Sequence, residues 1–453
     1  MYFVYSALMA LAVLLTSPYW LIQGLRHHKY LSNLAERLGF SFPGLAGLPN
    51  DRPGAIWLHA VSVGEALSAV PLAKRLKETY PHRPIVVSTT TLTGFALAKE
   101  RMPFADAFLY FPLDWAFSVR RALDAVRPAL VLILETEIWP NFLHEANRRS
   151  IPVVFLSGRI SDRSFARYRQ YLGTFGFFLR PFLASALRNA AAYLMQTETD
   201  AQRIRALGAP AECVKVSGNL KYDMALPEST ELSRWLAEEC KRRQRWPLIV
   251  AGSVVATEEP LTLIAFGVLQ GDFPKALLVL APRKPERFAA AAEFIDESHR
   301  KFVRRSDLPV AGPGFNPNSG KVNGIPEDVT VLLLDSIGEL ASLYSLADGA
   351  FVGGSLVEAG GHNILEPAAF GKVPVFGPSM ENFAAIAKRF LDAGAAIQVE
   401  SPEDAGVEWI ELLKQPEKMK KMGESAKALV ENSRGALDRA LAEVARCLDG
   451  TSR

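Results

Sequence analysis

A carboxylate stands where an apolar run of the sequence turns into a helix-like segment. In HAVSVGEALSAV, residues 59–70, Glu65 follows Gly64, and the run AIWLHAV before it has the composition of a buried strand. The dipole of a helix favours an acid in its first turn by up to about 1 kcal/mol. Open α/β sheets, however, bind ligands at the carboxyl ends of their strands. Glu65 is therefore either a helix-capping acid or a general base that takes a proton from a substrate hydroxyl.

Two further glutamates end another apolar run. In ALVLILETEIWPNF, residues 129–142, Glu135 and Glu137 stand on either side of Thr136. The alternation of a continuing strand would put both on one face, where a pair of carboxylates can hold sugar hydroxyls. The alternative is one helix cap and one surface acid, and the sequence does not decide which glutamate matters more.

A glycine-rich segment has the residues of a nucleotide site. In FVGGSLVEAGGHNILEPAAFGKVPVFGP, residues 351–378, Gly360 and Gly361 precede His362 and Asn363, and Glu366 follows one turn later. Glycines allow a ligand to approach the backbone, and amides at a helix start bind anions. A glutamate there can take the two hydroxyls of a ribose. A tight glycine turn followed by a helix-dipole acid is the alternative.

Basic residues follow the apolar run ALLVL. Arg283 and Lys284 in APRKPERF, residues 281–288, would emerge at the carboxyl end of a strand, where a guanidinium can stabilise a leaving phosphate. A solvated basic loop is the alternative. Ser253, after PLIVAG, is a weaker candidate for the same site. Lys221 in GNLKYD lies near the expected joint between domains, where it could reach a ligand or serve the joint alone.

Alternating strand-like and helix-like segments must position these residues. Six apolar runs occur between residues 55 and 197 and six more between 247 and 378, with helix-like segments between them. This rhythm predicts an α/β protein with mostly parallel sheets. We expect two Rossmann-like doubly wound domains facing a cleft. The expected boundaries are an N-terminal anchor at 1–29, a first domain at 30–225, and a second domain with the C-terminal helices at 226–453.

The charge balance excludes one class of partner. With 51 basic and 48 acidic residues the net charge is +3, which is not the footprint of a nucleic-acid binder. The chain has no Asp-x-Asp pattern and no His, Cys and carboxylate cluster at ligand spacing, so we expect no metal cofactor.

The N-terminal segment is the most apolar part of the chain. Residues 2–25 contain no charged side chain over 24 positions, and about 20 suffice to cross a bilayer as a helix. The basic residues Arg26, Lys29 and Arg37 follow the run, which predicts a single-pass anchor with the body in the cytoplasm. Pro18 weakens this interpretation, and a helix lying in the membrane surface is the alternative.

Five motifs together resemble the 3-deoxy-D-manno-oct-2-ulosonic acid (Kdo) transferases of Gram-negative bacteria, which have the GT-B fold. They are HAVSVGE, ETEIWPN, GNLKYD, APRKPERF and GGHNILEPAAFGKVPVFGP, in this order. The resemblance implies inverting transfer of Kdo from CMP-Kdo to a lipid A precursor (lipid IVA) at the cytoplasmic face of the inner membrane. It makes Glu65 the general base, and the helix dipole should keep this glutamate ionised.

The remaining candidates fall into two sets. We predict that the acceptor or Kdo contacts Ser62, Gly64, Glu135, Glu137 and Lys221. We predict that CMP contacts Ser253, Arg283, Lys284, Gly360, Gly361, His362, Asn363 and Glu366. Two alternatives stay open, a nucleotide-sugar epimerase or hydrolase of the same fold and a non-catalytic membrane-anchored nucleotide-binding module. The number of Kdo residues added, the accepted acyl pattern and the oligomeric state are not encoded in these motifs.

Overall fold

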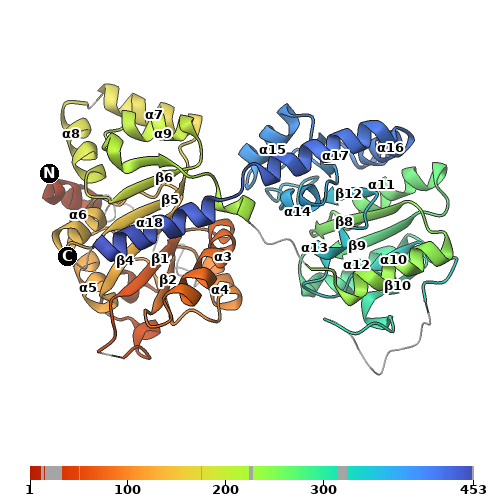
Figure 1. The fold of residues 1–453 in the computed structure, drawn as a ribbon, viewed down its shortest axis with the longest axis horizontal. Coiled ribbons are helices and arrows are strands. Elements are labelled where there is room, and N and C mark those ends of the chain that lie inside the picture. The colour runs from red at the N-terminus through yellow and green to blue at the C-terminus, as the bar shows by residue number, and fades with distance from the viewer. Residues whose placement is uncertain are drawn as a thin grey trace. The chain divides into compact units, whose positions relative to one another are not determined.

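The alternating strands and helices are divided between two α/β units. The computed structural model describes residues 1–11, 15, 33–49, 51–174, 176–223, 228–313 and 324–450. The first unit comprises Met1–Met224 and Ser433–Arg453, and the second comprises Ala225–Asn432 (Figure 1). Each unit has one parallel sheet of seven described strands. The prediction of two α/β domains with parallel sheets is therefore confirmed.

The sheet of the first unit has the strand order β3-β2-β1-β4-β5-β6-β7. Its central strands are buried over their whole length because helices cover both faces. Six of the strands lie in the apolar runs. The seventh, β7, was missed because it has only three residues, two of them exposed, at the sheet edge. The strands are β1 (Ala55–Ala60), β2 (Ile85–Thr89), β3 (Ala107–Tyr110), β4 (Pro128–Leu134), β5 (Val153–Gly158), β6 (Ala192–Met195) and β7 (Val214–Val216).

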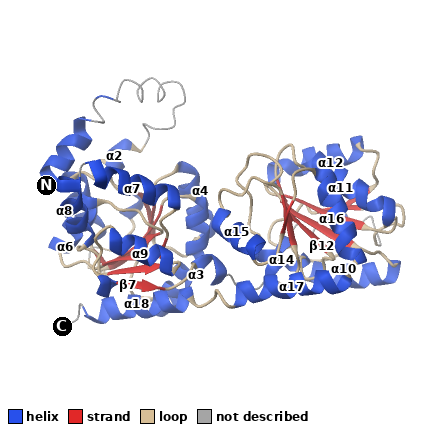
Figure 2. Cartoon of the chain, turned by 90° about the horizontal axis from the view of Figure 1, so that it is seen from above, coloured by secondary structure: helices blue, strands red, loops and turns tan. Residues whose placement is uncertain are grey.

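Helices connect these strands and bury one face each. In α5 the buried Val119, Leu123 and Val126 recur at intervals of three or four residues, which puts them on one side of the helix. Figure 2 shows the strand layers with helices on their faces. The helical elements are α2 (Leu34–Arg37), η1 (Pro43–Leu45), α3 (Val63–Thr79), α4 (Leu92–Arg101), α5 (Ala116–Val126), α6 (Pro140–Arg148), α7 (Asp162–Thr174), α8 (Gly176–Leu187), α9 (Glu198–Ala206), η2 (Ala211–Cys213) and η3 (Leu220–Asp223).

The second sheet has the order β10-β11-β9-β8-β12-β13-β14. Six strands again lie in the predicted apolar runs, and the two-residue edge strand β14 was missed. The strands are β8 (Leu248–Val254), β9 (Leu277–Pro282), β10 (Phe302–Arg304), β11 (Val331–Leu333), β12 (Gly349–Val352), β13 (Pro374–Phe376) and β14 (Ile397–Gln398). The helical elements are α10 (Glu231–Arg243), α11 (Glu259–Asp272), η4 (Pro285–Arg287), α12 (Phe288–Glu297), η5 (Arg305–Asp307), α13 (Leu340–Leu343), α14 (Leu365–Ala369), α15 (Ala384–Asp392), α16 (Pro402–Lys414) and α17 (Pro416–Glu431).

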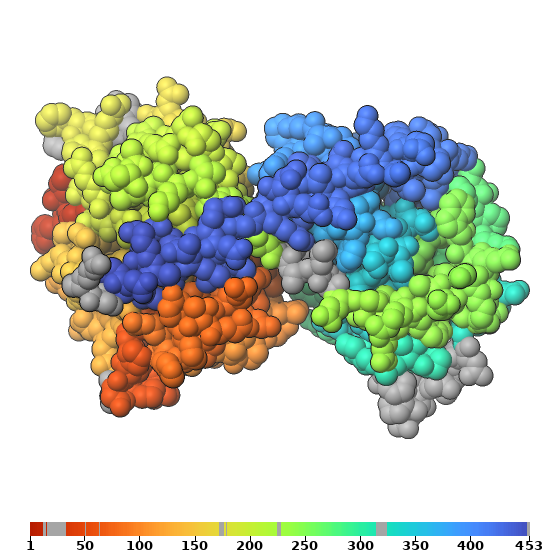
Figure 3. Space-filling view, viewed as in Figure 1, coloured from red at the N-terminus to blue at the C-terminus, as the bar shows by residue number. Residues whose placement is uncertain are grey.

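The last helix, α18 (Ala436–Gly450), belongs to the first unit. Its buried Ala440 and Val444 share one hydrophobic cluster with Leu130 and Leu132 of β4. Figure 3 shows this helix as a blue band across the surface of the first unit. The predicted second domain, residues 226–453, therefore extends too far. The apolar face of α18 completes the core of the first sheet, and sequence periodicity does not reveal which core a helix covers.

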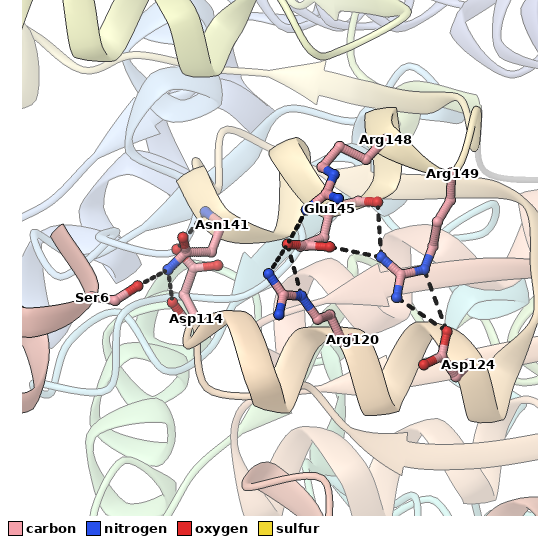
Figure 4. A network of polar contacts seen from close by, with 8 residues as sticks. All are labelled: Ser6, Asp114, Arg120, Asp124, Asn141, Glu145, Arg148 and Arg149. Carbon is pink, nitrogen blue, oxygen red and sulfur yellow. Dashed lines mark hydrogen bonds and ion pairs between the residues drawn. The ribbon is translucent and has the colours of Figure 1, made fainter. Parts of the chain in front are cut away.

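The N-terminal residues 2–11 are helical and lie against α6 and α8. The ring of Tyr2 stacks on His144 at 4.1 Å, and Asn141 Nδ2 donates to Ser6 Oγ at 2.9 Å. Figure 4 shows the hydrogen bond between Asn141 and Ser6. In the same view, the carboxylate of Glu145 pairs with three arginines, Arg120, Arg148 and Arg149. This short helix is therefore held on the body of the first unit by polar and aromatic contacts.

The predicted membrane anchor falls mostly on residues outside the described part of the chain, namely 12–14 and 16–29. Within the described residues, no helix combines the length and the apolar character needed to cross a bilayer.

Candidate active site

Glu65 lies in the first turn of α3, directly beyond the carboxyl end of β1. Its side chain is only 7% exposed. Oε2 accepts from the amide of Val61 at 2.8 Å, and Oε1 accepts from the hydroxyl of Ser62 at 2.7 Å. Ser62 is the N-cap of α3, and its Oγ accepts from the amide of Glu65. The capping interpretation is thus realised, and each carboxylate oxygen keeps a second lone pair for a substrate hydroxyl.

The environment of Glu65 strengthens it as a base. Burial raises the pKa of its carboxyl group, and the charge of Glu135 raises it further, against the lowering effects of Ser62, Val61 and Lys221. Removal from water disfavours the charged form of an acid. Burial and the like charge of Glu135 therefore act against the helix dipole, which was expected to keep this glutamate ionised.

The two glutamates after β4 join Glu65. Burial, followed by the charges of Glu65 and Glu135, raises the pKa of Glu137 to about 7. Glu135 has a left-handed backbone with φ of 56°, and its carboxylate lies 3.9 Å from Nζ of Lys221. The structure thus brings together three carboxyl groups and one lysine that were predicted from separate motifs. We name these four residues, Glu65, Glu135, Glu137 and Lys221, the carboxyl cluster.

Gly64, the remaining acceptor-side candidate, has free space beside it. A Cβ at this position would meet no atom within 4 Å, so packing does not require glycine here.

The GNLKYD motif fixes the lysine of this cluster. The backbone amide of Lys221 donates to Asn219 Oδ1 at 2.9 Å, and the amide of Leu220 donates to Ser157 Oγ at 3.0 Å. Asp223 accepts from the amides of Gly435 and Leu437 and so caps α18 at 2.5 and 2.8 Å. The motif therefore serves both the cluster and the attachment of the last helix.

Two residues near the cluster were missed by the sequence analysis. The pKa of Tyr168 on α7 is raised by burial and then by the charge of Glu137, which places its hydroxyl near the cluster. Ser157, the penultimate residue of β5, has φ of 53°, and its hydroxyl accepts from the first amide of η3. Neither position carries a sequence signal, because both act through contacts with distant segments.

In the second unit, Arg283 follows β9 and is half-buried, whereas Lys284 is exposed. The amide of Arg283 donates to the carbonyl of Val254 at 2.8 Å, which ties it to the end of β8. Ser253 lies in that end with φ of 57°, at an irregularity in the pairing of β8 with β9. Arg283 and Ser253 are thus neighbours at the carboxyl edge of the second sheet, as predicted, and Lys284 faces solvent.

The glycine pair before His362 forms a turn that only glycine fits. Gly360 and Gly361 have φ of 83° and 69°. A Cβ on Gly360 would lie 2.4 Å from Nδ2 of Asn382, and one on Gly361 would lie 2.3 Å from Sδ of Met380. Packing and backbone conformation therefore explain these glycines, as the alternative interpretation proposed.

The positive charge of Arg283 acts to lower the pKa of both His362 and Glu366 by electrostatic interaction. Burial and Arg283 lower the pKa of His362 to about 4, so the imidazole is neutral at pH 7. Its Nε2 is buried and has no hydrogen-bond partner in the described part of the chain. Burial raises the pKa of Glu366, while Asn363 and Arg283 lower it. Asn363 Oδ1 accepts from the amide of Leu365 at 3.1 Å and so starts α14. These four residues form the core of the predicted nucleotide site.

The expected helix-start anion site is weaker than predicted. The helix after His362, α14, has only five residues, Leu365–Ala369, and therefore a small dipole. The amides of Gly354, Ser355 and Leu356 all donate to the carboxylate of Glu258. Arg283 is the cation whose charge acts on both His362 and Glu366.

No group of three or more His, Cys, Asp or Glu side chains within the described ranges has the arrangement of a metal site.

Comparison with known proteins supports the resemblance seen in the motifs. Residues 32–224 match the family model described as 3-Deoxy-D-manno-octulosonic-acid transferase (kdotransferase), and residues 321–429 match Glycosyl transferases group 1. The 3-deoxy-D-manno-octulosonic acid transferase of Haemophilus influenzae is 34% identical over 443 residues, which are 97% of each chain. The chain belongs to the Kdo transferase family.

Two further proteins place this Kdo transferase family member among its relatives. The transferase of the same name from Bordetella pertussis is 34% identical and covers 88% of this chain and 89% of its own. The crystal structure of MurG from Acinetobacter baumannii covers 87% of this chain and 100% of its own, with a TM-score of 0.51 and 15% identity. That likeness concerns the fold alone and agrees with the predicted GT-B class. The family assignment makes the protein a glycosyltransferase.

Proposed function

We propose that this glycosyltransferase moves Kdo from CMP-Kdo to a lipid A precursor, lipid IVA, with inversion at the anomeric carbon. The observation that carries the proposal is the placement of Glu65, buried at the end of β1 among two further carboxyl groups and a lysine. A base in such a setting suits a sugar hydroxyl, which is a poor nucleophile until its proton leaves.

The acceptor half of the reaction uses the carboxyl cluster. Glu65 takes the proton of the acceptor hydroxyl while the oxygen forms a bond to the anomeric carbon of Kdo. The bonds from Val61 and Ser62 hold the carboxylate in one orientation, which saves the entropy of positioning it during reaction. Glu135, Glu137 and Lys221 offer acceptors and a cation to the hydroxyls and the carboxylate of the sugars.

The donor half uses the nucleotide site of the second unit. The bond between the anomeric carbon and the phosphate oxygen breaks, and CMP leaves with the electron pair. Arg283 can pair with this phosphate through its guanidinium fork. Neutral His362 can form a hydrogen bond with this phosphate through Nε2, which has no partner within the described residues. We propose that Glu366 takes the ribose hydroxyls.

The proposed reaction uses no resident metal ion. The leaving group carries a single phosphate, for which one guanidinium and neighbouring donors are sufficient. Turnover should therefore persist after treatment with a chelator and dialysis. Loss of turnover that Mg²⁺ restores would contradict this part of the proposal.

We propose further that the N-terminal segment anchors the protein in the inner membrane, with the body in the cytoplasm. Apolar side chains of its described part are strongly exposed, including Phe3 at 85%, Leu8 at 60% and Leu15 at 71%. A second exposed ring, Phe177 at 86%, lies on α8, the helix that the N-terminal helix contacts. Membrane fractionation of the full chain, with and without a carbonate wash, tests the anchor.

The decisive experiment is mass spectrometry of products from CMP-Kdo and a tetraacylated lipid A precursor. Wild-type protein should add mass in units of Kdo, and Glu65→Gln should add none while still binding CMP. The same spectra count the Kdo residues added. Absence of product from a wild-type preparation that binds CMP would overturn the proposed reaction.

A further inference from the structure

Glu258 is a fully buried carboxylate whose hydrogen-bond partners in the described part of the chain are backbone amides and not cations. It stands at the N-cap of α11, just after β8, with 0% exposure. Its Oε2 accepts from the amides of Val255 at 3.2 Å and Gly354 at 2.6 Å. Its Oε1 accepts from the amides of Ser355 and Leu356, both at 3.0 Å. Four backbone donors thus surround one side chain.

These donors come from two loops that are about a hundred residues apart in the sequence. Val255 follows β8, and Gly354 to Leu356 follow β12, which pairs with β8. Gly354 has φ of 70°, and the three successive amides after β12 converge on one point. Such a concave set of amides is a nest that binds anions. In this protein the anion is supplied by the chain itself, because Glu258 fills the nest.

The nest loop supports the residues predicted to meet the nucleotide. The carbonyl of Gly354 accepts from the amide of Gly361 at 2.7 Å. A Cβ on Gly354 would lie 3.0 Å from Nε2 and from Cδ2 of His362, so the imidazole rests against the backbone that Glu258 holds. Ser355 continues the support, since its hydroxyl accepts from the amide of Gly377 at 2.8 Å.

We propose that Glu258 is a positioning residue of the donor site. Its carboxylate holds the loop after β12 so that Gly361 and His362 stand where the phosphate of the nucleotide meets them. The role is positioning and not donor contact, because both carboxylate oxygens are already engaged by backbone amides. The inference rests on the proposed function, in which this site binds CMP-Kdo.

Removing the negative charge while keeping the shape tests the role. In Glu258→Gln the side-chain NH₂ must face two backbone N–H groups, so one pair of amides loses its acceptor and the loop shifts. A displacement of about 1 Å at a binding group can cost about 100-fold. We expect the KM for CMP-Kdo and the Kd for CMP to rise about tenfold or more, with the KM for the lipid acceptor unchanged.

A matched control separates positioning from stability. Glu339 is also buried in the second unit, but its carboxylate pairs with Arg305 and accepts from Ser336, and neither partner lies in the loop after β12. Glu339→Gln should lower the Tm and leave the KM for CMP-Kdo unchanged. If Glu258→Gln does not fold, Gly354→Ala offers a second route, because its Cβ presses on His362 and its φ of 70° strains the loop while the carboxylate stays. That variant should also raise the KM for CMP-Kdo.

The outcomes distinguish the inference from the proposed function. Wild-type protein that fails to bind CMP in calorimetry would remove the donor assignment itself. Wild-type protein that binds CMP, with Glu258→Gln and Gly354→Ala showing wild-type Kd and KM, would overturn the positioning role. In that case Glu258 would only stabilise the second unit, as a lowered Tm would show.

Discussion

Burial acts on different kinds of titratable group in the two units, on carboxylic acids in the first and on a histidine in the second. In the first unit, burial raises the pKa of Glu65 and Glu137 and so makes carboxyl groups hold protons more strongly. In the second unit, burial lowers the pKa of His362 and leaves a neutral ring beside Arg283. The first setting prepares a base for a hydroxyl, and the second prepares a cation and hydrogen-bonding groups for a phosphate. The same desolvation suits both because it always disfavours the charged form of the group that it acts on.

The assignment of a base to the first unit would be wrong if Glu65 could be replaced without loss of turnover. Glu65→Gln should lower kcat by about 100-fold or more, because general-base catalysis contributes about 10² to 10⁴. The Kd for CMP, a property of the second unit, should stay within twofold. Glu78→Gln, on the exposed end of the same helix, is the control and should turn over normally. Turnover is measured by release of CMP.

A loss at the lower end of that range is expected when the cation of the nucleotide site is removed. Arg283→Ala should lower kcat/KM for CMP-Kdo by about 100-fold, the range seen when one group that stabilises transition-state charge is deleted. Lys284→Ala should change it less than threefold, because this neighbouring side chain is exposed. Equal effects of the two substitutions would show that only the net charge of the loop matters.

The raised pKa of Glu137 makes the stability of the first unit depend on pH, which can be tested. A carboxyl group with a pKa of about 7, above its ordinary value of 4.5, binds its proton more tightly in the folded state. The contribution of this group to the free energy of unfolding is fully present below pH 4.5 and is lost as the pH rises through 7. Glu137→Gln should therefore gain a few °C in Tm relative to wild type between pH 5 and pH 8. Scanning fluorimetry at both pH values checks this, and a Tm difference independent of pH would contradict it.

The smallest effect is expected from the titration of His362. With a pKa of about 4, the imidazole does not change charge between pH 5.5 and 8.5. Plots of KM for CMP-Kdo against pH should therefore run parallel for wild type and His362→Asn over this range. A limb near pH 6.5 that the substitution removes would show that the ring is protonated when the donor binds.

Most of the fold could be predicted because buried parallel strands are written as continuous apolar runs. Of the fourteen strands in the described part of the chain, twelve lie in such runs, and β7 and β14 do not. Edge strands bury little and take their pairing from a neighbour, so two or three residues suffice and leave no pattern. The helix α18 was misplaced for a related reason, since an apolar stripe predicts burial but not the partner.

The site could be predicted where one motif carries it. Glu65, Glu135 and Arg283 each follow an apolar run, and the ends of strands are where α/β proteins place such groups. The raised pKa of Glu65 could not be predicted, because it comes first from burial in the folded unit and then from the charge of Glu135, which follows another strand. The role of Glu258 could not be predicted either, because its three hydrogen bonds to the loop after β12 join segments about a hundred residues apart.

The return of α18 to the first unit has a consequence for synthesis on the ribosome. The second unit, Ala225–Asn432, is one continuous stretch, whereas the first is interrupted by it. Domains generally fold as units while the chain emerges from its N-terminus. Until α18 is made, Leu130 and Leu132 of β4 lack the helix that covers them. The unit whose synthesis begins first is therefore the one whose core closes last.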